Sequence, residues 1–155
     1  EWFEQAPPAG GRAVRFALGA IDALPRVDIL HAHAGMSVDL IDAAIAGGAR
    51  GIVIAGVGAG NMSAAAIERL HAAVERGTVV VRSSRVVSAM VLRNSELDDD
   101  RWGFVAAGDL NAPKSRVLLQ LAEDGDVVAV QAGAMGIVAG FGRRSQGFPR
   151  RRRLR

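Results

Sequence analysis

Short apolar runs alternate along this chain with segments in which apolar residues recur every three or four positions. The short runs are typical of β-strands and lie at residues 27–33, 51–57, 78–83 and 104–107. The segments with helical spacing lie at residues 38–46, 63–76 and 111–121. Strands that alternate with helices predict βαβ crossovers and a parallel sheet. We therefore expect an α/β domain, a small three-layer arrangement in which parallel strands are flanked by helices on both faces.

The last of these helices has clear signals at its start. Asn111 is a residue that commonly caps helices, and Pro113 falls in the first turn, where its missing N–H costs nothing. The apolar spacing that follows predicts that Val117, Leu118 and Leu121 face inward.

Composition divides the chain into three parts. Residues 1–23 are a poorly specified entry segment, residues 24–122 are the patterned α/β domain, and residues 123–155 are a tail rich in Gly and Arg. The net charge of +3 comes from this tail, because the seven Arg of residues 143–155 leave residues 1–142 with a charge of −4. We expect the tail either to lack a settled structure or to be the product of a change in reading frame.

The tail also raises the question of a membrane or a nucleic acid as partner. Its apolar stretch at residues 127–142 holds sixteen residues, which reach about 24 Å as a helix against a hydrocarbon core of roughly 30 Å. The Arg run at residues 150–155 has no interleaved aromatic residues, so it predicts unspecific attraction to anions at most. We therefore expect no membrane span and no specific nucleic acid, and keep a tail-driven association as one alternative.

A Gly-rich turn follows the second predicted strand, where small ligands collect in parallel sheets. The dinucleotide pattern G-x-G-x-x-G does not fit, because it would require Gly at position 61 or 63, where Asn61 and Ser63 stand. The turn instead offers the amide side chain of Asn61 beside a helix N-terminus. Asn61 is thus either a ligand-binding residue or merely the cap of the following helix.

The loop after the third strand carries an acidic run that ends in Asp98, Asp99 and Asp100. Such a run is usually a solvated loop, or less often a weak cation site. Glu96 is separated from the aspartates by Leu97, which turns it away from them. Glu96 is therefore a candidate to bind an ammonium group.

Other familiar chemistries find little support. The absence of Cys excludes a disulfide scaffold, a Cys-ligated zinc and a thiol nucleophile. His31 and His33 face the same side of a predicted strand, but they have no evident third metal ligand beyond the nearby Asp39 and Asp42. No G-x-S-x-G elbow surrounds the serines at positions 83 and 84. We expect neither a metal nor a cofactor.

Three segments, residues 51–61, 80–86 and 103–122, closely resemble the C-terminal domain of bacterial type II L-asparaginases. Residues 24–30 resemble its opening strand. The resemblance implies an α/β domain that pairs with a larger N-terminal domain and forms a homo-oligomer, in the cytoplasm or periplasm of a bacterium. It also implies cofactor-free hydrolysis of L-asparagine, and often of L-glutamine, to the acid and ammonia.

Two residues of the family's substrate site match positions in this chain. The Asn at the end of the Gly-rich turn corresponds to Asn61, and the Glu before the Asp pair corresponds to Glu96. In the family both complete the site of a neighbouring subunit, with the Glu near the substrate's α-ammonium. The implied partners are L-asparagine or L-aspartate and an N-terminal asparaginase domain or neighbouring subunit.

The nucleophile that the resemblance implies has no counterpart here. The family uses a Thr of its N-terminal domain, whereas the single Thr of this chain, Thr78, falls in a predicted strand. No catalytic residue is therefore assigned, and we expect the chain alone to be inactive. The alternative functions are a non-catalytic small-molecule-binding α/β module and an inactive fragment.

Overall fold

The computed structural model describes residues 23–122, 128–132 and 135–139. Four parallel strands form one sheet in the order β1 (Val27–His31), β2 (Gly51–Gly56), β3 (Val79–Ser84) and β4 (Val105–Ala106). The register pairs Val27 with Gly51 and Gly51 with Val79, so the carboxyl ends of β1, β2 and β3 lie at one edge of the sheet. This arrangement confirms the predicted parallel sheet.

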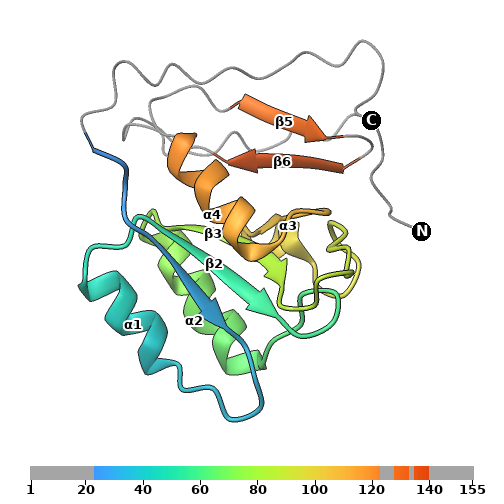
Figure 1. The fold of residues 1–155 in the computed structure, drawn as a ribbon. Helices are drawn as coiled ribbons and strands as arrows, with labels where there is room; N and C mark the ends of the chain where they lie inside the picture. The colour runs from blue at the N-terminus through green and yellow to red at the C-terminus, as the bar shows by residue number, and fades with distance from the viewer. Residues whose placement is uncertain (1–22, 123–127, 133–134, 140–155) are drawn as a thin grey trace, which may run out of the picture.

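Helices cover both faces of the sheet, as Figure 1 shows. Helices α1 (Asp39–Ala46) and α2 (Ala64–Glu75) lie on one face, and α4 (Ala112–Leu121) crosses the other. Each face has its own buried cluster, because successive strand residues point to opposite sides. The cluster under α1 and α2 contains Ile41, Ile52, Ile54, Leu70 and Val80, and the cluster under α4 contains Val27, Val53, Val81 and Leu119. The predicted three-layer α/β class is confirmed.

The central strand β2 is buried along its whole length, which explains why its sequence is apolar at every position instead of alternating. Helix α4 begins as predicted, since the Asn111 side chain accepts a hydrogen bond from the N–H of Lys114. The predicted inner face of α4 is wrong in one respect, because Val117 is half exposed. Small residues, Ala112 and Ser115, let the helix lie close to the sheet together with Leu119.

Helix α4 also returns the chain to its first strand. The Nε of Arg116 donates to the carbonyl of Val27 (2.8 Å), and the Nε2 of Gln120 donates to the carbonyl of Pro25 (3.0 Å). These bonds join residues that are 89 and 95 positions apart in the sequence. The two ends of the α/β domain therefore lie next to each other.

The predicted tail contains one element that the sequence did not indicate. Strands β5 (Val128–Ala132) and β6 (Met135–Ala139) pair antiparallel in a separate two-stranded sheet. β-Branched residues in both strands favour this conformation, and the expectation for the tail as a whole stays a prediction. The rest of the predicted tail and nearly all of the entry segment 1–23 lie outside the described residues. Among the residues described, no helix is long and apolar enough to span a membrane.

Candidate functional site

The turn after β2 closes on itself through backbone hydrogen bonds. The N–H of Val57 donates to the carbonyl of Asn61, and the N–H groups of Gly60 and Asn61 donate to the carbonyl of Val57. Gly58 and Gly60 have positive φ angles of 55° and 92°, which residues with a Cβ rarely adopt. A Cβ on Gly56 would lie 2.4 Å from the backbone of Gly60. The glycines therefore serve a tight chain reversal, and these three amides are occupied within the turn.

Asn61 lies at the end of this turn, and its side chain is exposed. Its Nδ2 donates a hydrogen bond to the Oε2 of Glu96 at 2.9 Å. Helix α2 is capped by another residue, because the Ser63 hydroxyl accepts from the N–H of Ala66. The interpretation of Asn61 as merely a helix cap is therefore wrong, and the two candidate residues are brought together.

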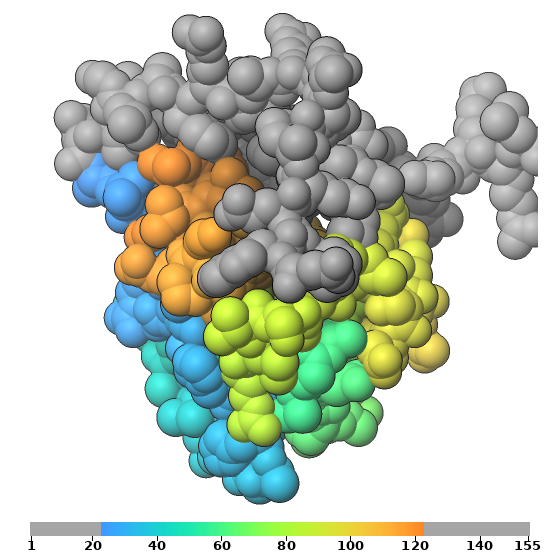
Figure 2. Space-filling model, turned by 45° about the vertical axis from the view of Figure 1, so that its right-hand side comes forward, coloured from blue at the N-terminus to red at the C-terminus, as the bar shows by residue number. Residues whose placement is uncertain are grey.

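Glu96 belongs to the loop between β3 and the short helix α3 (Asp99–Trp102), a helix that the sequence did not predict. The Glu96 side chain is exposed, whereas its neighbour Leu97 packs against the core under α1 and α2. Figure 2 shows the yellow-green surface that follows β3 beside the green surface near the turn after β2. The N–H of Arg85 donates to the carbonyl of Gly56 at 2.9 Å, which joins the two loops directly.

The three aspartates after Glu96 have separate roles. Asp98 caps α3 by accepting from the N–H of Arg101. Asp99 is fully buried, and Asp100 pairs with Arg93 at the surface. Each carboxylate thus has a protein partner and a different direction. Neither the solvated-loop interpretation nor the cation-site interpretation fits the run as a whole.

The buried partner of Asp99 is Arg82, which sequence analysis did not single out. Its Nε and Nη2 donate to the two carboxylate oxygens at 2.7 and 2.6 Å, and neither side chain is exposed. A signal was present in the sequence, because Arg82 follows three valines in a strand that is otherwise apolar up to that point. A charge inside such a strand requires a buried partner.

The two serines after Arg82 also hold loops in place. The Ser83 hydroxyl donates to the carbonyl of Leu110 at 2.9 Å, and the Ser84 hydroxyl donates to the carbonyl of Gly58 at 2.6 Å. Both are buried. Their hydrogen bonds to backbone carbonyls fit the sequence-based view that these serines do not form a hydrolase elbow.

The contacts of His33 and His71 are made with residues other than Asn61 and Glu96. The Nδ1 of His33 lies 2.9 Å from the carbonyl of Ala34, and His71 packs edge-on against Trp102 with ring centroids 5.3 Å apart. Asp42, considered with His31 as a metal ligand, pairs with Arg69 at 3.4 Å. Within the described part of the chain, no three His, Cys, Asp or Glu side chains gather as a metal-binding group.

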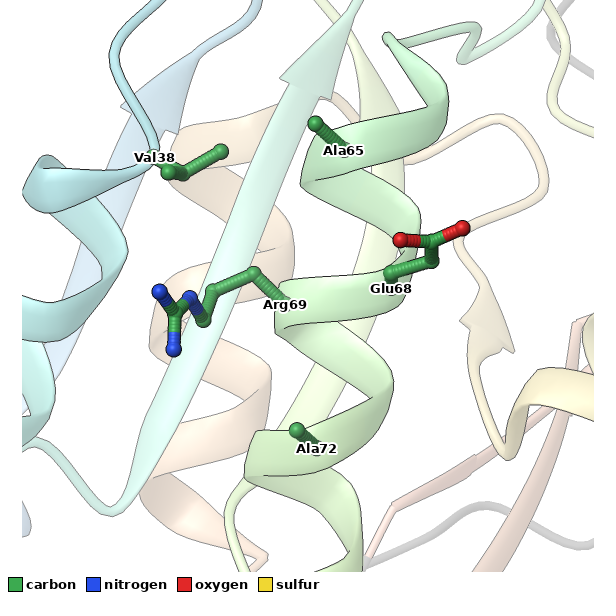
Figure 3. Close-up of a pocket in the computed structure, with 5 residues that line it drawn as sticks. All are labelled: Val38, Ala65, Glu68, Arg69 and Ala72. Atoms are coloured by element: carbon green, nitrogen blue, oxygen red, sulfur yellow. The ribbon is translucent and has the colours of Figure 1, made fainter.

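A groove lies between α1 and α2, and Figure 3 shows the side chains that line it. Arg69 extends from α2 toward α1, whereas Glu68 points to the other side of α2. The remaining lining residues are Val38, Ala65 and Ala72. The groove includes neither Asn61 nor Glu96, and it offers small apolar side chains instead of a converging polar set. It is a weaker candidate than the pair at the sheet edge.

Thr78 does not belong to the candidate site. It is buried and lies just before β3, because the strand begins at Val79, one residue later than predicted. Asn61 and Glu96 follow the carboxyl ends of β2 and β3, so Thr78 lies at the opposite edge of the parallel sheet. Its hydroxyl therefore cannot act as a nucleophile beside the Asn61–Glu96 pair.

Comparison with known proteins gives consistent matches. The sequence model of the glutaminase/asparaginase C-terminal domain family matches residues 26–126. "Probable L-asparaginase periplasmic" of Haemophilus influenzae is 48% identical over 107 residues, and L-asparaginase 2 of Escherichia coli is 44% identical over the same length. Each alignment covers 69% of this chain and 31% of the relative. The glutaminase-asparaginase of Acinetobacter glutaminasificans is 42% identical over 104 residues, which are 65% of this chain and 31% of that protein.

Proposed function

Because the chain belongs to the glutaminase/asparaginase C-terminal domain family, we propose that it completes the substrate site of an L-asparagine amidohydrolase. The resemblance found in the sequence is thereby confirmed at the level of the family and of this domain. The chain spans 31% of the length of the curated relatives that it matches first, so activity, substrate and partners belong to the proposal. The proposed reaction consumes L-asparagine and water and releases L-aspartate and ammonia.

The observation that carries the proposal is the hydrogen bond between the exposed side chains of Asn61 and Glu96. Glu96 uses one lone pair of Oε2 for Asn61 and keeps further acceptor sites for a donor outside the chain. An α-ammonium group is such a donor, and its contact with the carboxylate would be charge-assisted. Asn61 orients the carboxylate and leaves its own carbonyl free to accept a second hydrogen bond.

The chain by itself is expected to bind substrate weakly and not to hydrolyse it. Both proposed site residues lie on an exposed edge, which cannot enclose a small ligand without a second surface. Thr78 lies at the opposite edge of the sheet, which supports a nucleophile from another domain or subunit. We propose an N-terminal asparaginase domain, in the same subunit or a neighbouring one of a homo-oligomer, as the partner that supplies it.

The test combines the chain with the N-terminal domain of a close relative and measures asparagine hydrolysis. Glu96→Gln keeps the shape of the side chain and removes its charge. A charge-assisted hydrogen bond contributes about 1.5–3 kcal/mol, so kcat/KM for asparagine should fall about ten- to a hundredfold. Glu68→Gln is the matched control, because Glu68 is an exposed carboxylate on α2, and it should leave kcat/KM unchanged.

Two outcomes would contradict the proposal. An active combined enzyme in which Glu96→Gln has no more effect than Glu68→Gln would remove Glu96 from the site. Hydrolysis by the 155-residue chain alone would show that the nucleophile lies within it. The alternative of a non-catalytic binding module predicts a different result, namely binding of L-aspartate by the isolated chain that Glu96→Gln weakens.

A further inference from the structure

Arg82 and Asp99 form the most deeply buried charged group among the described residues, and the proposed function does not use either of them directly. Replacing a buried ion pair by apolar residues of similar volume is often neutral for stability or even favourable. The presence of such a pair is therefore weak support for a purely stabilising role. Its contacts show which parts of the molecule it arranges.

The Arg82 guanidinium joins three segments of the chain. Its Nη1 donates to the carbonyl of Ala59 at 2.7 Å, two residues before Asn61. Its Nη2 donates to the carbonyl of Leu92 at 2.9 Å, within the loop that carries Glu96 and four residues before it. The same nitrogen, together with Nε, binds Asp99, three residues after Glu96. One planar side chain thus fixes the turn that bears Asn61 and both ends of the segment that bears Glu96.

Asp99 extends this arrangement. Its Oδ2 also accepts a hydrogen bond from the N–H of Asn94 at 2.9 Å. Asn94 has a positive φ of 57°, so the chain reverses direction there, two residues before Glu96. The loop is consequently anchored at positions 92, 94 and 99, while the Glu96 side chain between them is exposed.

The geometry points to Arg82 and Asp99 as positioning residues that hold Asn61 and Glu96 at hydrogen-bonding distance. The exposed pair has few restraints of its own, since its 2.9 Å contact joins two surface side chains. Its relative placement depends on the two loop backbones, and Arg82 binds both. The consequence for catalysis rests on the proposed function, whereas the consequence for the Asn61–Glu96 contact does not.

The contact is measured in the 155-residue chain by NMR of the Asn61 side-chain amide. In the wild-type background, Glu96→Gln changes the hydrogen-bond acceptor and should shift this signal. In an Arg82→Lys background the buried charge is kept, but one ammonium cannot reach all three segments with the geometry of a planar fork. The change in the Asn61 signal caused by Glu96→Gln should then be at least about threefold smaller. Asn61 and Glu96 would no longer be held in contact, so a substitution at one would have less effect on the other.

Two further variants separate positioning from stability. Arg82→Met combined with Asp99→Leu removes both charges and should also reduce the response, even where the melting temperature is retained. Arg93→Gln removes an exposed ion pair from the same loop and should leave the response at its wild-type size. An undiminished response in either Arg82 background overturns the inference. So does unfolding of both, since the pair would then be a stability element only.

Kinetics of the combined enzyme provide the second readout. If wild type is active, Arg82→Lys should lower kcat/KM for asparagine about tenfold, mainly through KM, because a misplaced carboxylate weakens capture of the substrate. If wild type is inactive, the proposed function fails, while the NMR response still decides the positioning role. A loss confined to kcat, with the NMR response intact, contradicts it.

Discussion

Two ion pairs lie on opposite sides of the same loop, and they differ in almost every physical respect. Arg82 and Asp99 are fully buried and form a fork with several backbone contacts, whereas Arg93 and Asp100 are more than half exposed. The aspartates are neighbours in the sequence. The buried side of this loop determines where the backbone runs, and the exposed side presents groups to a partner. Two adjacent aspartates, Asp99 and Asp100, therefore have different roles: one fixes the backbone and the other lies at the surface.

The largest expected effect is on the buried side. Asp99→Ala leaves the Arg82 guanidinium without its counter-charge in the interior. We expect the free energy of unfolding to fall by about 3–5 kcal/mol, measured by denaturant unfolding of the 155-residue chain. Asp100→Ala, one position along, should change it by less than about 1 kcal/mol. Equal losses for the two variants would abolish the distinction between the sides.

A smaller effect is expected where the Gly-rich turn meets the buried side. At Gly60, φ is +92° and a Cβ would lie 2.9 Å from the Nη1 of Arg82. Gly60→Ala should therefore lower stability by about 2 kcal/mol through backbone strain and displacement of Arg82. Gly58→Ala is the matched control, because φ is +55° but no atom lies within 4 Å of the added Cβ. It should cost about 1 kcal/mol, and an equal cost would show that Arg82 yields without penalty.

The smallest expected change in stability concerns two polar residues that precede α2, Asn61 and Ser63. Ser63→Ala removes the helix cap and should reduce stability by about 1 kcal/mol. Asn61→Ala removes only an exposed hydrogen bond and should change stability by less than about 0.5 kcal/mol, measured in the same unfolding experiment. In the combined enzyme the order should reverse, with Asn61→Ala lowering asparagine turnover more than Ser63→Ala. The same order in both assays would make Asn61 a structural residue.

Most of the fold was accessible from the sequence because its signals are local. The apolar run of β2 and the capping residue of α4 determine those elements with little help from the rest of the chain. Which face of α4 packs against the sheet was harder to predict. Its contact face is selected by how closely small residues such as Ser115 approach the sheet, so the larger Val117 remains outside. Hydrophobic spacing does not contain that information.

The candidate site residues could be predicted from the sequence for a different reason. Asn61 and Glu96 follow strands at the edge where ligands collect, and the family resemblance selects the same two positions. The role of Asp99 could not be predicted from the sequence, because three consecutive aspartates are chemically equivalent there. Only the short helix α3 decides which of them turns inward. The role of its partner Arg82 was easier to predict, since a charged residue at the end of a run of valines is unusual.

The contact between α4 and β1 has a consequence for synthesis of the chain. Val27, Val53 and Val81 belong to three successive strands, and all three are covered by the last helix of the domain. Within the part of the chain that the structure describes, Gln120 and Arg116 donate hydrogen bonds to the carbonyls of Pro25 and Val27. During translation, the α4 side of β1 therefore stays without this helix until nearly a hundred later residues have been synthesised. Chaperones that shield apolar surface have their longest opportunity to act on this face, and a ribosome that stalls before α4 releases a sheet prone to aggregation.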